Sequence, residues 1–211
     1  MTRVKICGIM NRSDLSSAIS AGADAVGFIV EIDDSRHCLS VDEAANLIKL
    51  VPVFTKSVAV VAPGGVEEAV ELAKRTRSDI LQVHGSLCSE ELSKLKGRVH
   101  QKLVAAVAAG SGLEDAQSFA RSADAILLDS MVNGKLGGTG TAHDWDQSAE
   151  IARSLPVPTI LAGGLNPGNV VEAILKVRPY AVDVSSGAET GGKKDLEKIR
   201  SFISEVRSCP Q

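Results

Sequence analysis

The chain has 211 residues, of which 44% are hydrophobic and 23% charged, and its formal net charge is −3. This composition is that of a globular protein with a large core, and because aromatic residues make up only 3%, that core must be aliphatic. No block of Lys and Arg forms a basic patch, and no apolar run approaches the roughly 20 residues of a membrane span. We therefore expect neither a nucleic-acid nor a membrane partner, and without a charged-then-apolar leader we expect a cytoplasmic protein.

Short β-branched runs alternate with amphipathic helical stretches along the whole chain. The predicted strands are residues 4–6, 25–29, 55–60, 80–83, 101–104, 125–128, 159–161 and 181–184. Helices with recognisable start signals are predicted at residues 15–21 (opened by Ser13 and Asp14), 44–50 and 170–177, and a last helix at about 196–207. Ser40 and Glu43 have the spacing of a capping box before the second of these helices. Strict βα alternation indicates a parallel sheet.

Two architectures fit such alternation, a closed (β/α)8 barrel and an open doubly wound sheet. About eight βα units in just over 200 residues suit a minimal barrel. An open sheet more often has five or six strands, and no GxGxxG motif follows the first predicted strand. No linker-like change of composition divides the chain. We therefore predict one α/β domain over residues 1–211, a single (β/α)8 TIM barrel.

The four cysteines do not form a metal or disulfide pattern. They are widely scattered, at Cys7, Cys38, Cys88 and Cys209, and no CxxC pair occurs. Taken alone, each is most simply a small buried hydrophobe. His84 ends a predicted strand, but no second ligand lies at metal-binding spacing, so we predict a structural histidine and no metal site.

Three acidic or thiol side chains occupy equivalent places at strand ends. In a barrel the chemistry lies at the carboxyl ends of the strands, and side chains alternate between the axis and the outer helices. Lys5 and Cys7 share one face of the first strand, opposite its apolar residues. The same alternation turns Asp129 and Asp183 inward. We expect Cys7, Asp129 and Asp183 to meet at the mouth of the barrel, although Asp129 in isolation fits a turn cap equally well.

Glycine-rich turns cluster in the last third of the chain. They are Gly137-Gly138-Thr139-Gly140, Gly163-Gly164 and Ser185-Ser186-Gly187, at predicted strands six to eight. One such turn is ordinarily only a tight connection that needs positive φ. Together they predict a phosphate site, because barrels commonly bind phosphate after strands seven and eight, where backbone N–H groups approach an anion closely.

Arg36 lies in the loop after the second predicted strand. An arginine in a βα loop can hold a carboxylate through a forked contact, although a solvated surface arginine is the more common case.

At this point the chain resembles a known family over nearly its whole length and in order. The motifs that carry the resemblance are Val4-Lys5-Ile6-Cys7-Gly8-Ile9, Gly22-Ala23-Asp24-Ala25-Val26-Gly27-Phe28, Ser35-Arg36, Leu81-Gln82-Val83-His84-Gly85, Leu127-Leu128-Asp129-Ser130, Gly137-Gly138-Thr139-Gly140, Asp144-Trp145, Ala162-Gly163-Gly164-Leu165-Asn166-Pro167 and Val182-Asp183-Val184-Ser185-Ser186-Gly187-Ala188-Glu189. Each motif is weak alone, but the ordered set resembles the phosphoribosylanthranilate isomerases of tryptophan biosynthesis.

The resemblance implies an Amadori rearrangement of N-(5′-phosphoribosyl)anthranilate. By position it makes Cys7 the general base, Asp129 the general acid and Arg36 the residue that binds the anthranilate carboxylate. It assigns the substrate phosphate to Gly163, Gly164, Ser185, Ser186 and Gly187, and a further substrate contact to Asp183. We expect no cofactor, because the substrate nitrogen can act as the electron sink, and we expect no obligatory protein partner.

Two other functions remain open on the sequence. A lyase or synthase with a Schiff-base lysine would use Lys56 or Lys102, but it leaves Cys7 unexplained. A catalytically silent barrel that binds a phosphorylated metabolite would keep the glycine turns, but it gives no reason to pair Cys7 with Asp129.

Overall fold

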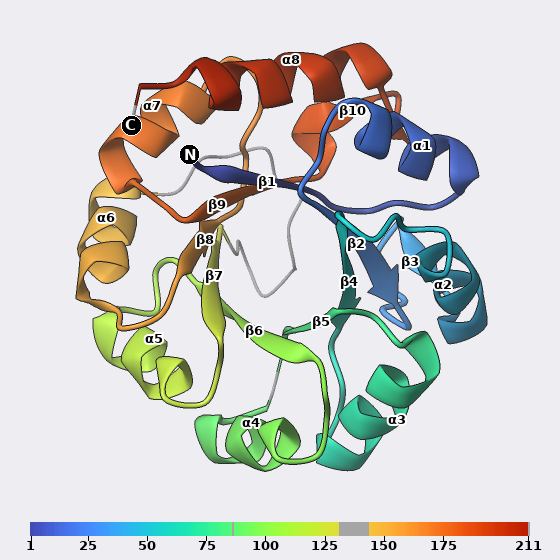
Figure 1. Ribbon diagram of the computed structural model, residues 1–211. Coiled ribbons are helices and arrows are strands. Elements are labelled where there is room, and N and C mark those ends of the chain that lie inside the picture. The colour runs from blue at the N-terminus through green and yellow to red at the C-terminus, as the bar shows by residue number, and fades with distance from the viewer. Residues whose placement is uncertain (86, 131–143, 211) are drawn as a thin grey trace.

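A computed structural model of the chain describes residues 1–85, 87–130 and 144–210. Within them, eight parallel strands form a closed ring with eight α-helices around it, which confirms the predicted (β/α)8 barrel (Figure 1). The barrel strands are β1 (Arg3–Ile6), β2 (Ala25–Val30), β4 (Lys56–Val61), β5 (Ile80–Val83), β6 (Lys102–Ala108), β7 (Ala125–Asp129), β8 (Thr159–Leu161) and β9 (Ala181–Val184).

The helices follow the strands in regular alternation. They are α1 (Arg12–Ser20), α2 (Val41–Ile48), α3 (Val66–Thr76), α4 (Ser89–Lys96), α5 (Leu113–Ala120), α6 (Trp145–Ser154), α7 (Val170–Val177) and α8 (Leu196–Ser208). Four short elements lie outside the regular pattern: β3 (Cys38–Leu39), the 3₁₀ turn η1 (Ser186–Ala188), β10 (Glu189–Thr190) and β11 (Lys193–Lys194).

The ring closes where β1 pairs with both β2 and β9. In the β1–β9 ladder Lys5 is the direct neighbour of Asp183, so these two inward-facing residues lie side by side. In the β6–β7 ladder Ala108 is the neighbour of Asp129. Register therefore decides which strand-end side chains meet inside the barrel.

The helix starts agree with the sequence in one case and differ in another. Ser40 caps α2 and the Glu43 carboxylate accepts from the Ser40 backbone, which confirms the predicted capping box. For α1 the predicted opening at Ser13 and Asp14 was wrong. Asn11 is the cap, because its side-chain oxygen accepts from the Asp14 backbone N–H.

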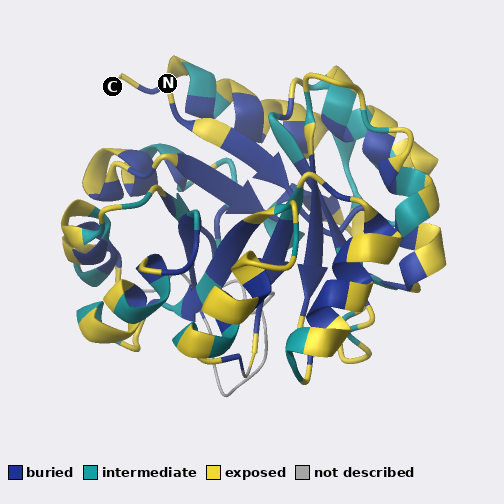
Figure 2. Cartoon of the chain, turned by 60° about the horizontal axis from the view of Figure 1, so that its bottom comes forward, coloured by how far each residue is buried: buried dark blue, intermediate teal, exposed yellow. Residues whose placement is uncertain are grey.

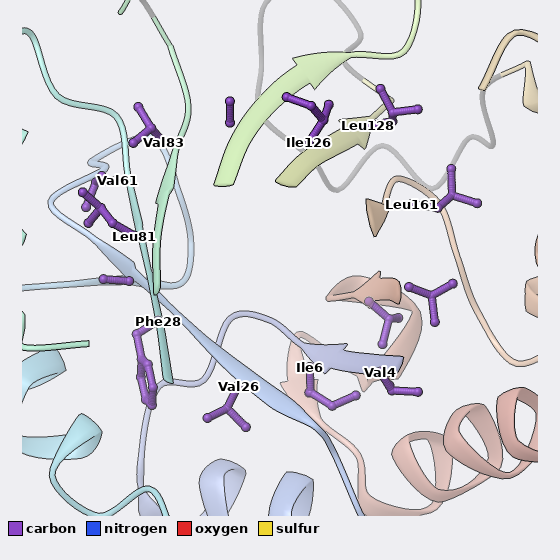
Figure 3. Packing of buried hydrophobic residues seen from close by; sticks show 14 of the residues in the cluster. Val4, Ile6, Val26, Phe28, Val61, Leu81, Val83, Ile126, Leu128 and Leu161 are labelled. Carbon is purple, nitrogen blue, oxygen red and sulfur yellow. The ribbon is translucent and has the colours of Figure 1, made fainter. Parts of the chain in front are cut away.

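Apolar side chains form one layer outside the strands and smaller clusters inside them. The burial pattern shows strands buried on both faces and helices buried on one (Figure 2). Outward-facing residues such as Val4, Ile6 and Val26 belong to the main core under the helices (Figure 3). Inside the barrel, Cys7 packs with Val58 and Val60. The predicted alternation along β1 is therefore confirmed.

No helix in the described part of the chain is long and apolar enough to cross a membrane.

Candidate active site

A cavity of about 330 Å³ opens at the carboxyl ends of the barrel strands. Its volume is in the range of pockets that hold small metabolites. The predicted site residues that line it are Cys7, Arg36, Asp129, Gly163, Gly164, Asp183, Ser185 and Ser186. The structure thus brings together residues that lie as much as 179 positions apart, between Cys7 and Ser186.

Cys7 is the first residue after β1, and its backbone N–H donates to the Val184 carbonyl at 2.9 Å. This bond extends the β1–β9 ladder by one step and turns the thiol toward the barrel axis. The next residue, Gly8, has a φ of 78°, a conformation that favours glycine, and it ends the strand there. The thiol is 7% exposed and free of any disulfide, so it faces the cavity from a largely buried position.

Gly27 in β2 makes room for the thiol and for Lys5. A Cβ at this position would lie 2.8 Å from the Cys7 sulfur and 3.1 Å from the Lys5 Nζ. Both atoms therefore crowd the same point of the β2 backbone, and any larger residue would displace them.

Lys5 and Asp183 form an ion pair inside the barrel. The Lys5 Nζ donates to Asp183 Oδ2 at 2.8 Å, and the two side chains are only 5% and 8% exposed. The other oxygen, Asp183 Oδ1, is buried with no hydrogen-bond partner among the described residues, and Asp183 also lines the cavity. A buried acceptor without a partner is costly, so Oδ1 is available to a donor on a bound molecule.

The charges around Cys7 act on its pKa in opposite directions. Burial raises the pKa of the thiol, since it disfavours the charged thiolate. The Lys5 ammonium opposes this by its charge and by a hydrogen bond, while the Asp183 carboxylate adds to the rise. The net effect is a pKa above the ordinary value for cysteine.

Asp129 ends β7, and its side chain enters the same cavity. Burial raises the pKa of this carboxyl to about 6, the negative charge of Asp183 adds to the rise, and Lys5 opposes it. The Asp129 Oδ1 is buried without a hydrogen-bond partner among the described residues. A carboxyl that releases its proton near pH 6 and has an oxygen without a partner beside a cavity is suited to deliver a proton to a bound molecule.

The turns after β8 and β9 form one wall of the cavity. Gly163 and Gly164 have φ values of 85° and 66°, and a side chain at Gly163 would collide with Ser130. Gly187 is not among the residues that line the cavity, and it packs against the Leu165 carbonyl, where a Cβ has no room. It therefore holds the two turns together, and its role in binding phosphate stays a prediction. The turn Gly137-Gly138-Thr139-Gly140 lies outside the described residues.

Arg36 reaches the cavity, but its guanidinium is already paired. Its Nη2 donates to Glu189 Oε2 at 2.6 Å, while 57% of the arginine side chain stays exposed. The Glu189 carboxylate also lies 3.0 Å from His37 Nε2 and accepts from Lys194. Burial alone would raise the pKa of Glu189, but His37 and Lys194 lower it to about 2. Glu189 is thus a carboxylate that orients Arg36 at the rim.

His84 and Gln82, both on or just after β5, form the opposite wall. The Gln82 amide nitrogen lies 2.6 Å from His84 Nε2. Burial, together with the charge of Lys5, lowers the pKa of His84 to about 3, so the imidazole is neutral. It is a polar, uncharged group of the cavity wall, and its expected structural role stays a prediction.

The two lysines proposed for a Schiff base lie away from the cavity. Lys56 and Lys102 are the first residues of β4 and β6, at the other end of the barrel. They are exposed and paired with Asp79 and Asp124. A synthase or lyase of that type is therefore not supported. Within the described ranges no three His, Cys, Asp or Glu side chains are grouped to hold a metal ion.

Sequence reasoning did not single out Glu189, Lys194, His37 or Gln82 as site residues. Glu189 stands at the end of one quoted motif, and Gln82 beside His84 in another, so proximity to those motifs was the available signal. The link from Lys194 to the site depends on the β10–β11 hairpin, which brings its ammonium to the Ser185 carbonyl at 3.2 Å.

Comparison with known proteins gives one consistent result. The family described as N-(5′-phosphoribosyl)anthranilate isomerase matches residues 4–205. N-(5′-phosphoribosyl)anthranilate isomerase of Methanothrix thermoacetophila is 56% identical over 209 residues, which cover 99% of this chain and 100% of that protein. A relative of the same name from Methanosarcina mazei is 46% identical over 98% of this chain and 95% of its own length.

Solved structures of the same kind share the fold. Phosphoribosyl anthranilate isomerase from Thermotoga maritima superposes with a TM-score of 0.84 at 34% identity, covering 98% of this chain and 99% of that one. A phosphoribosyl anthranilate isomerase in complex with reduced 1-(o-carboxyphenylamino)-1-deoxyribulose 5-phosphate has a TM-score of 0.81 at 33% identity, with the same coverage.

Proposed function

The chain belongs to the N-(5′-phosphoribosyl)anthranilate isomerase family, enzymes of tryptophan biosynthesis, and from this premise we propose its reaction and mechanism. We propose that it converts N-(5′-phosphoribosyl)anthranilate into 1-(2-carboxyphenylamino)-1-deoxyribulose 5-phosphate by general acid and base catalysis without a cofactor. In this proposal residues 1–211 act as one barrel domain. Cytoplasmic location stays a prediction.

The observation that carries the proposal is that Cys7 and Asp129, both largely buried, line the same cavity. A buried thiol and a carboxyl with a pKa of about 6 are the two proton-transfer groups that an aldose-to-ketose rearrangement needs. A silent binding protein has no use for either.

In the first step Asp129 donates its proton to the oxygen of the ribose ring. The bond between C1′ and the ring oxygen breaks, and the nitrogen lone pair forms a C1′=N iminium. In the second step the Cys7 thiolate removes the proton from C2′, and the electrons of that C–H bond move toward the iminium nitrogen. The resulting enolamine becomes the ketone by proton transfer. Each placed proton transfer typically contributes about 10²–10⁴-fold to the rate.

Different groups of the cavity lining are proposed to bind the two charged ends of the substrate. Gly163, Gly164, Ser185 and Ser186 would hold the phosphate through backbone N–H groups, and Gly187 would keep their turns together. Arg36 would bind the anthranilate carboxylate with the part of its guanidinium that Glu189 leaves open. The relative solved with a reduced deoxyribulose phosphate derivative supports a ligand of this shape.

Purified protein mixed with N-(5′-phosphoribosyl)anthranilate should convert it, followed as loss of the substrate's fluorescence in the presence of a metal chelator. We expect turnover at an unchanged rate with and without the chelator, because the proposed proton transfers need no metal. Absence of turnover would overturn the proposed reaction, and a rate abolished by the chelator would overturn the cofactor-free mechanism.

Arg36→Ala should mainly raise KM, by roughly 10–100-fold, since one charge-assisted hydrogen bond contributes about 1.5–3 kcal/mol. Steady-state kinetics of the same conversion measure the change, with kcat within a fewfold of the parent. Arg75→Ala is the matched control, because Arg75 is also partly exposed and paired with a carboxylate, Asp42, but lies on α3. An unchanged KM in Arg36→Ala would remove this residue from the substrate site.

A further inference from the structure

We propose that Lys5 is a positioning residue that holds the Cys7 thiolate by a charge-assisted hydrogen bond, and that the Asp183 carboxylate competes with the thiolate for the Lys5 ammonium. The inference deepens the proposed function and rests on Cys7 being its base. It gives a role to a buried charge that the proton transfers described above do not use.

The backbone places the three groups next to one another. Lys5 and Cys7 are two residues apart, and their Nζ and Sγ atoms both lie within about 3 Å of the place that a Cβ of Gly27 would occupy, 3.1 Å and 2.8 Å from it. Lys5 and Asp183 are direct neighbours in the β1–β9 ladder and are joined at 2.8 Å. The ammonium therefore stands between a carboxylate and a thiol, with little freedom to turn elsewhere.

Lys5 keeps its charge in this position. Burial lowers the pKa of the ammonium, but Asp183 and Cys7 outweigh burial, and the pKa ends above the ordinary value for lysine. An unpaired buried lysine would instead tend to lose its proton. The ammonium is therefore positive when Cys7 ionises, and the thiolate itself helps to keep it so.

Among the described residues, no other group near Cys7 replaces this charge. The faces of β2 and β4 against the thiol are apolar, with Ala25, Ile29, Val58 and Val60. The remaining charged or titratable groups that line the cavity are Asp34, Arg36, His37, His84 and Asp129. Lys194, below the Ser185 turn, also lowers the pKa of the thiol, but less than Lys5 does.

The two partners of one ion pair are therefore expected to affect Cys7 in opposite directions. Lys5→Met removes the stabilising charge and the hydrogen bond, so the thiolate becomes harder to form. Asp183→Asn removes the competing negative charge and leaves Lys5 to the thiolate, which becomes easier to form. A general disturbance of packing would move the thiol the same way in both variants.

The test is the pH dependence of Cys7 alkylation by iodoacetamide in the ligand-free protein, read by mass spectrometry of the peptide that contains Cys7. The midpoint reports the pKa of the thiol, because the thiolate is the reactive form. We expect Lys5→Met to raise the midpoint by about one unit or more and Asp183→Asn to lower it by a smaller amount. Lys102→Met, which removes an exposed barrel lysine paired with Asp124, should leave it unchanged.

Lys5→Met leaves Asp183 buried without a partner, and this variant can fail to fold. The double variant Lys5→Met/Asp183→Asn removes both charges, and it should still show a raised midpoint, because Lys5 acts on the thiol more strongly than Asp183 does.

A midpoint that stays unchanged in both variants that lack Lys5, or that rises in Asp183→Asn, overturns the inference. The measurement needs no substrate, so it is independent of turnover. Failure of the unmodified protein to convert phosphoribosylanthranilate would overturn the proposed function instead, whatever the alkylation midpoints show.

Discussion

Cys7→Ser should reduce kcat by roughly 10²–10⁴-fold, because a serine hydroxyl is far too weak a base to take the C2′ proton near neutral pH. The substitution is nearly isosteric, so the backbone bond to Val184 and the space beside Gly27 are kept. Single-turnover kinetics should therefore show a lost chemical step, while the Kd for a substrate or product analogue stays within a fewfold of the parent.

Cys209→Ser is the matched control for this substitution. Cys209 is also buried, at 6% exposure, but belongs to the main core and does not line the cavity. Its replacement is expected to lower stability slightly and to leave kcat unchanged. A Cys7→Ser variant that keeps near-parental kcat would show that the thiol is not the base.

Asp129→Asn should lower kcat by a similar roughly 10²–10⁴-fold, because an amide cannot give a proton to the ring oxygen. Asp124→Asn, just before β7, is the control. Asp124 is partly exposed and accepts from the Leu103 backbone, so its loss should reduce stability and spare turnover. Retention of kcat in Asp129→Asn would contradict the assignment of the acid.

Stability separates a chemical from a structural effect at Asp129. Its folded pKa of about 6 lies above the unfolded value of about 3.9, so the folded state holds the proton more tightly. The free energy of unfolding therefore falls by about 2–3 kcal/mol as pH rises from about 4 to 6, and it stays at this lower value above pH 6. Asp129→Asn removes this cost, and its melting temperature at neutral pH should not fall below that of the parent.

The pKa values of Asp129 and Cys7 in the folded protein set the pH profile of kcat/KM. The acid has the lower pKa and the base the higher one, so only a minor fraction of molecules holds both Asp129 protonated and Cys7 ionised. Below about pH 6, kcat/KM falls because Asp129 is already protonated while the fraction of Cys7 thiolate keeps decreasing. Above the pKa of the thiol, kcat/KM falls because Cys7 is fully ionised while the fraction of protonated Asp129 keeps decreasing. The profile should be bell-shaped, with a plateau between the two values.

The small reactive fraction explains why Lys5 matters. Each unit by which Lys5 lowers the thiol pKa increases the thiolate fraction about tenfold on the plateau. Burial protects the carboxyl proton of Asp129 and also disfavours the thiolate of Cys7. The buried Lys5 ammonium stabilises the thiolate of Cys7 against burial. It also lowers the pKa of Asp129, so it makes the carboxyl proton easier to lose.

Local sequence patterns determined the order of strands and helices and the side chains that face the barrel axis. Alternation of β-branched runs and amphipathic helices indicated a parallel sheet, and about eight such units in one chain favoured a closed barrel over an open sheet. The period of two along β1 was enough to turn Lys5 and Cys7 inward, and strand-end positions were enough to nominate Asp129 and Asp183. These properties depend on neighbours within a few residues.

Pairings across the barrel could not be predicted in this way. That Lys5 meets Asp183 follows from the register of β1 against β9, which closes the ring over 178 residues of chain. The ion pair between Arg36 and Glu189 depends on the β10–β11 hairpin, which no sequence periodicity predicts. The pKa of Asp129 likewise depends on burial and on the charge of Asp183, both of which arise only once the barrel has closed.

The first strand shows this division clearly. The sequence by itself determined that a thiol would follow a short apolar strand and face the axis of a barrel. Only the tertiary structure decided its chemical state, since the Coulomb energy between Cys7, Lys5 and Asp183 depends on distances and burial that closure of the sheet creates.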